Sequence, residues 1–264
     1  MNLGAAAVVL RPRTLAEILD LACRLSCSLA LGLYLRLAAA VLLPCLAVCL
    51  ALRHALDWSW PAVWFVAACL GAAAQGVFTI AVGRLLFSEE LGAGQALRLF
   101  GRRFGAYLWM LILSRVILAA SASVVVALPF AWPRLVFVHE ASLLENAGGS
   151  EAIRRAGRFV NGRGVTAFGV LMALLATQAG FVVVAEFLGQ GLVDQVLQLG
   201  KPFGQLFWKG GSAYALAGFF LSVPYVATAR FLHYIDARTR SDGWDVQLRF
   251  MAIAAQGPAE RRAS

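Results

Sequence analysis

The sequence predicts an all-α polytopic transmembrane helix bundle of about six spans, with three basic amphipathic helices at the membrane interface. Hydrophobic residues make up 61% of the 264 residues and charged residues only 14%, whereas soluble domains carry about 25% charged residues. The mean hydropathy is +0.75. Apolar stretches near the roughly 20 residues that a membrane helix needs alternate with arginine-rich linkers. Too few charges are present to cover a water-exposed surface, so part of the surface must face lipid.

The formal net charge of +9 is spread between apolar runs rather than gathered in one patch. This distribution follows membrane topology and argues against a nucleic-acid partner. The dominance of Arg over Lys, with abundant Ala and Gly, is typical of a GC-rich bacterial genome. We therefore expect a single integral membrane domain, 1–264, in a bacterial cytoplasmic (inner) membrane.

The N-terminal region, 1–32, lacks the basic start and small-residue cleavage site of a cleaved signal peptide. Thr14-Leu-Ala-Glu17 predicts a capping box that begins an amphipathic helix. The first hairpin, 33–87, holds spans at Leu33–Leu52, with a kink at Pro44, and at Pro61–Phe87.

The middle region, 92–140, contains a second amphipathic helix followed by the apolar stretch Phe104–His139. This stretch is too long for one span and short for two. A single crossing would export the four arginines of Glu145–Arg163, against the preference of positive loops for the cytoplasm. We therefore predict a short hairpin here, either crossing twice or re-entrant, with Ser121 and Ser123 near its tip.

The last region, 148–234, reads as a third amphipathic helix and spans at Val165–Leu188 and Gly210–Leu232, before a cytoplasmic tail, 235–264. Both termini are then cytoplasmic. The chain repeats an amphipathic helix plus two spans three times. This pattern is either a true internal repeat or the ordinary alternation of basic linkers and hairpins.

Three motifs carry a resemblance to a family: "RPRTLAEILDLACRL" from Arg11, "VFVHEASLLENAGGSEAIRRAGRFVNGRG" from Val136, and "FLHYIDARTRSDGWDVQLRF" from Phe231. The chain resembles bacterial six-helix membrane proteins related to the membrane domain of glycerophosphoryl diester phosphodiesterase. Ala156 and Asp242 depart from the family's usual Ser and Glu. The resemblance implies fold and location but no activity, since the diesterase reaction of fused relatives belongs to a separate soluble barrel domain.

Polar residues within the predicted spans are the first candidate site, because a charge in lipid is costly and marks function by default. They could line a substrate path, or the arginines could snorkel to the interface of a shallow hairpin. These intramembrane candidates are Arg115, Arg134, Gln75 and Gln178.

The second candidate is a set of charged and signature residues on the inner face. It would tie the linker helices together, dock a cytoplasmic partner, or form a solvated helix. His139-Glu140 is interpreted as an interface cap in preference to an acid–base pair. The set comprises Glu140, Arg154, Arg155, Tyr234, Asp236, Arg238, Asp242, Gly243, Trp244 and Asp245.

No phosphate-binding loop, nucleophile elbow or histidine cluster is present in the sequence. The five cysteines lack further ligands at metal-site spacing and are expected to be packing residues. We predict no enzyme activity, no cofactor and no metal. The leading hypothesis is a membrane scaffold or accessory subunit whose basic face contacts anionic lipid or a partner protein. The alternative is a small transporter with a polar path between the helices.

Overall fold

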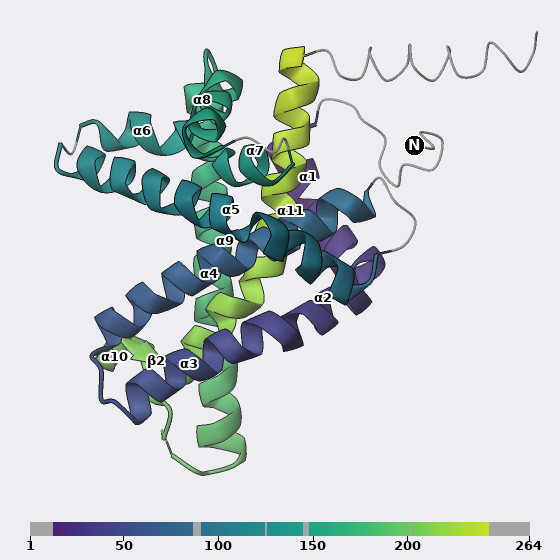
Figure 1. The fold of residues 1–264 in the computed structure, drawn as a ribbon. Helices are drawn as coiled ribbons and strands as arrows, with labels where there is room; N and C mark the ends of the chain where they lie inside the picture. The colour runs from purple at the N-terminus through teal and green to yellow at the C-terminus, as the bar shows by residue number, and fades with distance from the viewer. Residues whose placement is uncertain (1–12, 87–90, 125, 145–147, 201, 243–264) are drawn as a thin grey trace, which may run out of the picture.

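The computed structural model describes residues 13–86, 91–124, 126–144, 148–200 and 202–242, which form an all-α bundle apart from two short strands (Figure 1). Five helical segments are long and apolar enough to cross a membrane: Leu31–His54, Trp60–Leu85, Ala93–Ala122, Gly164–Val196 and Ala213–Arg240. These segments indicate an integral membrane protein. Four of them coincide with predicted spans to within a few residues, apart from longer extensions at the C-terminal ends of the last two.

The N-terminal part of the chain is a nearly continuous helix. The helix α1 (Leu15–Arg24) begins at the predicted capping box, in which Thr14 and Glu17 each accept the other's backbone N–H. It continues through the π-helix η2 (Leu25–Leu29), α2 (Leu31–Leu37), the π-helix η3 (Ala38–Leu42) and α3 (Leu43–His54). Pro44 stands directly after η3, where its missing N–H falls at an existing irregularity of the helix.

The second hairpin differs most from expectation. The helix α4 (Trp60–Leu85) ends the first hairpin, and α5 (Ala93–Ala122) then joins the second amphipathic segment and the following apolar limb into one helix. The return limb consists of two seven-residue helices, α6 (Leu128–Arg134) and α7 (Val138–Leu144). Each is only about 10 Å long, which is why five long spans are found where six were predicted. Pro129 and Pro133 lie in α6, where each lacks a backbone donor.

The C-terminal part begins with the amphipathic α8 (Gly149–Val160) and the long α9 (Gly164–Gln190), followed by the π-helix η4 (Gly191–Val196). The strands β1 (Gly204–Gln205) and β2 (Gly211–Ser212) form an antiparallel hairpin around the short α10 (Leu206–Lys209). The last helix, α11 (Ala213–Asp242), packs closely against α9. A Cβ at Gly218 would approach Ala185 and the carbonyl of Phe181 to 2.6 Å.

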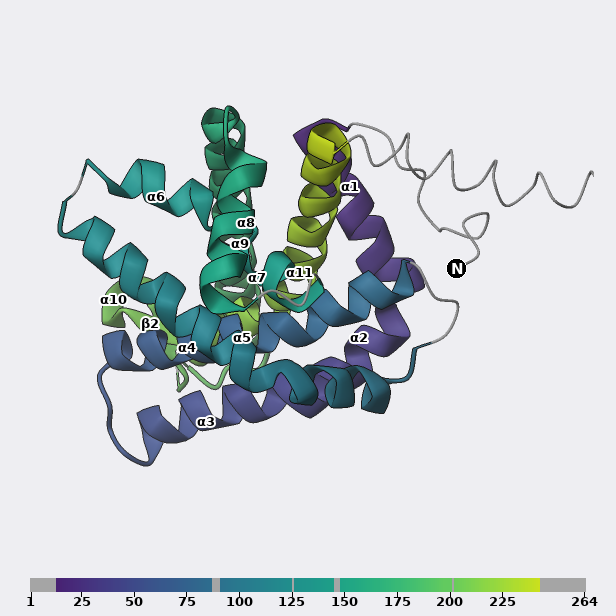
Figure 2. The same ribbon diagram turned by 45° about the horizontal axis from the view of Figure 1, so that its top comes forward.

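The helices α4 and α11 form the centre of the bundle. In the most apolar 18-residue stretch of α4 and of α11, 56% and 67% of the residues are buried. The corresponding share is 17% to 22% in the other three long segments. Both helices contribute to the two hydrophobic clusters of the core, one with α2 and α3 and one with α5, α7, α8 and α9. Figure 2 shows α5 and the α6 segment leaving this centre as an arm.

Two ends of the bundle can be told apart by their contacts. At one end, Trp64 Nε1 donates to the carbonyl of Gly210, which places the β-hairpin beside the start of α4. At the other end, Arg13 just before α1 and Arg163 just before α9 contact the end of α11, which stands at the top of Figure 1.

Candidate functional site

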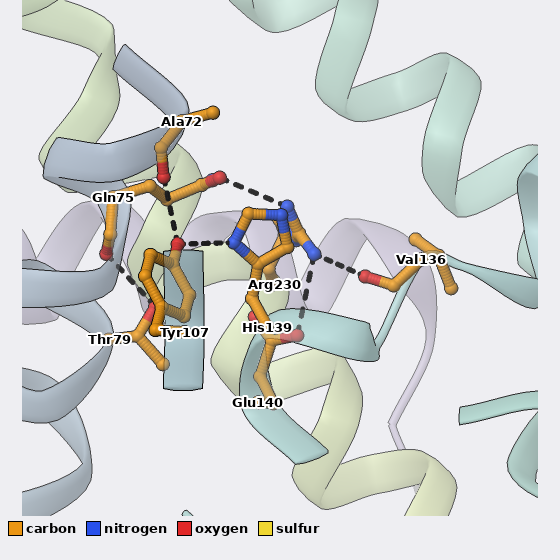
Figure 3. Close-up of polar contacts among 8 residues, drawn as sticks. All are labelled: Ala72, Gln75, Thr79, Tyr107, Val136, His139, Glu140 and Arg230. Atoms are coloured by element: carbon orange, nitrogen blue, oxygen red, sulfur yellow. Dashed lines mark hydrogen bonds and ion pairs between the residues drawn. The ribbon is translucent and has the colours of Figure 1, made fainter. Parts of the chain in front are cut away.

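A polar network lies inside the bundle, centred on Arg230 of α11 (Figure 3). The Arg230 guanidinium donates from Nη1 to Gln75 Oε1 of α4, 3.0 Å away, and from Nη2 to the carbonyl of Val136. Nη2 also lies 3.4 Å from Glu140 Oε2 of α7. One side chain thereby joins the two central helices to the irregular return limb.

A second chain of hydrogen bonds runs alongside. The hydroxyl of Tyr107 on α5 lies 2.8 Å from the carbonyl of Ala72 and 2.6 Å from His139 Nδ1. The carbonyl can only accept, so the single Tyr107 proton is donated to Ala72. His139 Nδ1 must then carry a proton and donate it to the Tyr107 oxygen. This assignment fixes the tautomer of a histidine that is only 4% exposed.

Glycine in α4 makes this arrangement possible. A Cβ at Gly76 would stand 2.6 Å from the Phe100 ring and 2.9 Å from the Tyr107 ring. The absent side chain lets α5 approach α4 closely enough for the Tyr107 hydroxyl to reach the backbone of Ala72.

The network is incompletely satisfied. Glu140 is fully buried, yet its Oε1 has no hydrogen-bond partner among the described residues, and neither does Arg230 Nε. Burial disfavours the charged form of the Glu140 carboxylate, while the positive charge of Arg230 favours it. A loose ion pair with an orphan oxygen contributes little net stability, since desolvation offsets much of the attraction. Such a pair is more often found where a group must change its state or partner.

The four intramembrane candidates separate in the structure. Gln75 is part of the network, whereas Arg115 is exposed on α5 and makes no hydrogen bond or ion pair with the described residues. Arg134 is exposed at the end of α6, and Gln178 is half-buried on α9; neither makes a side-chain hydrogen bond among the described residues. The sequence pattern thus found one member of the network, Gln75, without indicating its partners.

Glu140, His139 and Arg230 occupy places that the sequence interpretation did not give them. His139-Glu140 is not an interface cap, because both side chains are buried. Arg230 is in neither set of candidate residues, although it falls inside the predicted span Gly210–Leu232. That position, in an apolar run, was the signal that could have identified it.

The tail motif makes hydrogen bonds to residues near the starts of α1 and α9. Asp236 accepts from the backbone of Arg13 and from Arg240 Nε, both at 2.8 Å, and Arg240 Nη2 donates to the carbonyl of Arg13 at 2.7 Å. Arg163, beyond α8, donates to the carbonyl of Arg240 at 3.5 Å. These contacts join α11 to α1 and to the α8–α9 junction, while docking of a cytoplasmic partner by the motif stays a prediction.

The remaining members of that set are less connected. Tyr234 is buried, packs edge-on against Phe137 and Phe159, and accepts a hydrogen bond from Arg238 at 3.2 Å. Arg155 pairs with Glu151 one turn earlier, whereas Arg154 is exposed. Of Asp242 only the backbone is described, and Gly243, Trp244 and Asp245 lie outside the described residues.

Glu186 is a second buried carboxylate, which the sequence interpretation passed over. It lies near the end of α9 and accepts from Gln190 Nε2 at 2.5 Å, from the backbone of Leu206 at 2.8 Å, and from the Ser212 hydroxyl. The Ser212 oxygen in turn accepts from the backbone of Ala215 and caps α11. A single acidic residue in an apolar helix end was the available signal, but two of its three donors, Leu206 and Ser212, lie 20 and 26 residues further along the chain.

The described residues contain no cluster of three or more His, Cys, Asp or Glu side chains placed to hold a metal ion. Cys49 is buried and Cys45 half-buried, while Cys23, Cys27 and Cys69 are exposed, so the packing interpretation fits only part of the set. Comparison of the chain with protein-family models, with curated proteins and with solved structures found no match in any of the three.

Proposed function

We propose that this chain is a non-enzymatic integral membrane scaffold whose arginine-rich inner face binds anionic lipid headgroups. The observation that carries the proposal is a set of exposed guanidinium groups on α5 and α8 without an ionic partner among the described residues: Arg98, Arg102, Arg154 and Arg158. On α8, Ala152 and Ala156 are buried against the bundle, while the arginines lie on the opposite face. A basic amphipathic helix of this kind binds at a membrane interface.

The same inner end carries the proposed topology, with both termini in the cytoplasm. Arg163 contacts Arg240, and Arg13 contacts Asp236, so the starts of α1 and α9 and the end of α11 meet at one end. An even number of crossings must separate Arg13 from Arg163. With three long segments between them, the α6–α7 limb must return the chain to the inner side, as a re-entrant limb or a short span. This supports the six-span family resemblance independently of the charge count.

Lipid binding can be tested with paired variants in nanodiscs. Arg154→Gln/Arg158→Gln and Arg98→Gln/Arg102→Gln each remove two inner-face charges, and Arg53→Gln/Lys209→Gln removes two from the outer end. Each surface arginine contributes about 1 kcal/mol to binding of an anionic membrane, so each inner pair is worth about 2 kcal/mol. We expect the inner pairs to lower retention of phosphatidylglycerol, measured by native mass spectrometry, and the outer pair to leave it unchanged. Equal retention of phosphatidylglycerol in the two inner-pair variants and the outer-pair variant would refute the proposal.

Topology has its own test. A reporter inserted at Gly148 is expected to show cytoplasmic activity, and one inserted at Gly200 external activity. External activity at Gly148 would contradict both the returning limb and the cytoplasmic α8.

The second candidate function is a small permease with a polar path. The buried network supports it, because Arg230, Gln75 and Glu140 place charged and amide groups between helices in a chain with long apolar spans. A flux assay in proteoliposomes separates the two functions, since a scaffold leaves ion and small-anion leakage at the level of protein-free vesicles.

A further inference from the structure

The loop between η4 and α11, residues 197–212, is unusually apolar for a segment that connects two spans. Only two of its residues, Lys201 and Lys209, are charged. Its exposed large apolar side chains are Leu197, Leu199, Phe203, Phe207 and Trp208. Connecting loops in water usually carry polar side chains, and an exposed apolar patch marks an interaction surface.

Hydrogen bonds hold the backbone of this loop in one arrangement. Glu186 accepts from the backbone of Leu206 at 2.8 Å and from the Ser212 hydroxyl. Across the hairpin, the backbone N–H of Ala213 donates to the carbonyl of Phe203 at 3.0 Å. The side chains of α10, which lies between these contacts, are therefore presented on a fixed frame.

The two sides of the hairpin differ in what they contact. One side packs on the start of α4: a Cβ at Gly211 would stand 2.3 Å from the Trp60 ring, and Trp64 Nε1 donates to the carbonyl of Gly210. Phe207 and Trp208 are 65% and 86% exposed, so these two rings project away from the bundle.

Phe207 continues the lipid-facing surface of α9. Its ring centroid lies 5.8 Å from that of Phe187, which is itself 64% exposed and lies in the long apolar segment Gly164–Val196. Phe187 follows Gly164 by 23 residues, or about 35 Å along the helix axis. The hydrocarbon core of a bilayer is about 30 Å thick. With Arg163 at the opposite membrane boundary, this pair of rings lies close to the boundary at the other end of α9.

We propose that α10 and its two flanking strands form an interfacial anchor, which inserts Phe207 and Trp208 into the membrane surface at the end opposite Arg163. A tryptophan ring favours this depth because it joins an apolar body to a polar N–H. The surface is assigned to lipid rather than to a second protein because Phe207 is continuous with the lipid-facing side of α9.

Such an anchor fixes the depth of the α9–α11 pair in the bilayer. The contact is apolar and needs no headgroup charge, so it does not rest on lipid binding by the arginines of the inner face.

The test isolates the fluorescence of Trp208 in the full chain, reconstituted in phosphatidylcholine vesicles. The chain has seven tryptophans, so the spectrum of Trp208→Phe is subtracted from that of wild type. We expect this emission at a shorter wavelength than that of tryptophan in water, and strong quenching by lipid with bromine near the headgroup end of its acyl chains. Trp208 makes no side-chain hydrogen bond among the described residues, so the variant should keep the wild-type unfolding temperature.

The matched control is Trp109→Phe, which isolates a tryptophan that is 60% exposed on the long apolar helix α5. Brominated lipid should quench this emission as well, which establishes that the quencher reaches exposed rings on the spans.

Three outcomes overturn the proposal. Quenching of Trp208 by water-soluble acrylamide but not by brominated lipid would place the loop in water. Protection of Trp208 from both quenchers, with Trp109 still quenched by lipid, would mean that protein covers it. Stronger quenching by bromine at the far end of the acyl chains would place the ring in the hydrocarbon core instead of the interface. Because these vesicles contain no anionic lipid, failure of the anchor and failure of the lipid-binding scaffold are distinguishable.

Discussion

The chain buries two glutamates in very different ways. Glu186 accepts three hydrogen bonds from neutral donors and has no cationic partner among the described residues. Glu140 has one cation at 3.4 Å and an oxygen without a partner in the part of the chain that the structure describes. The first arrangement satisfies the carboxylate and closes the loop that holds the start of α11. The second leaves it dependent on a single residue, Arg230, which also holds Gln75 and the backbone of Val136.

This difference teaches that burial alone does not mark a functional carboxylate. A satisfied buried acid holds neighbouring segments together, whereas an unsatisfied one beside an arginine depends on that single partner. Three predictions test the contrast, from the largest expected effect to the smallest.

Arg230→Gln should lower the free energy of unfolding by about 3–5 kcal/mol, because it leaves the buried Glu140 charge without a counter-charge. Thermal unfolding in detergent measures the effect. The double variant Arg230→Gln/Glu140→Gln should recover much of the loss, since no buried charge then remains. A double variant as unstable as the single one would show that Arg230 acts through packing, and the contrast with Glu186 would disappear.

Gly76→Ala should destabilise the protein by about 1–3 kcal/mol through overpacking against Phe100 and Tyr107. The matched control is Gly105→Ala on α5, where a Cβ meets nothing within 4 Å. That change should be neutral or stabilise by up to about 1 kcal/mol through helix propensity. Equal unfolding temperatures for the two variants would contradict the close approach that brings Tyr107 to α4.

Ser212→Ala should cost about 1–2 kcal/mol, because it removes both the cap of α11 and a donor to Glu186. Ser123→Ala is the control, since that exposed hydroxyl only contacts the carbonyl of Ala120 within its own turn. Loss of the Ser212 hydroxyl should also increase the rate of proteolysis in the loop between α9 and α11. An unchanged rate of proteolysis would mean that Glu186 does not hold this loop in place.

The amino-acid sequence by itself determined the membrane class, four of the five long helices to within a few residues at most of their ends, and the capping box at Thr14. These features depend on local composition and on hydrogen bonds within one turn, which do not need the rest of the fold. The return limb could not be predicted from hydropathy, because Phe104–His139 is uniformly apolar and its breaks fall where packing and prolines interrupt the helix.

Only the tertiary structure decided the site. Arg230, Glu140, Gln75 and Tyr107 lie on four different elements, and no spacing in the sequence relates them. Their meeting depends on the missing side chain of Gly76 and on the entry of α7 between α4, α5 and α8. The same holds for Glu186, whose donors follow it by 4 to 26 residues. A polar group inside an apolar bundle must find partners wherever the packing brings them, and this requirement is met in three dimensions rather than along the chain.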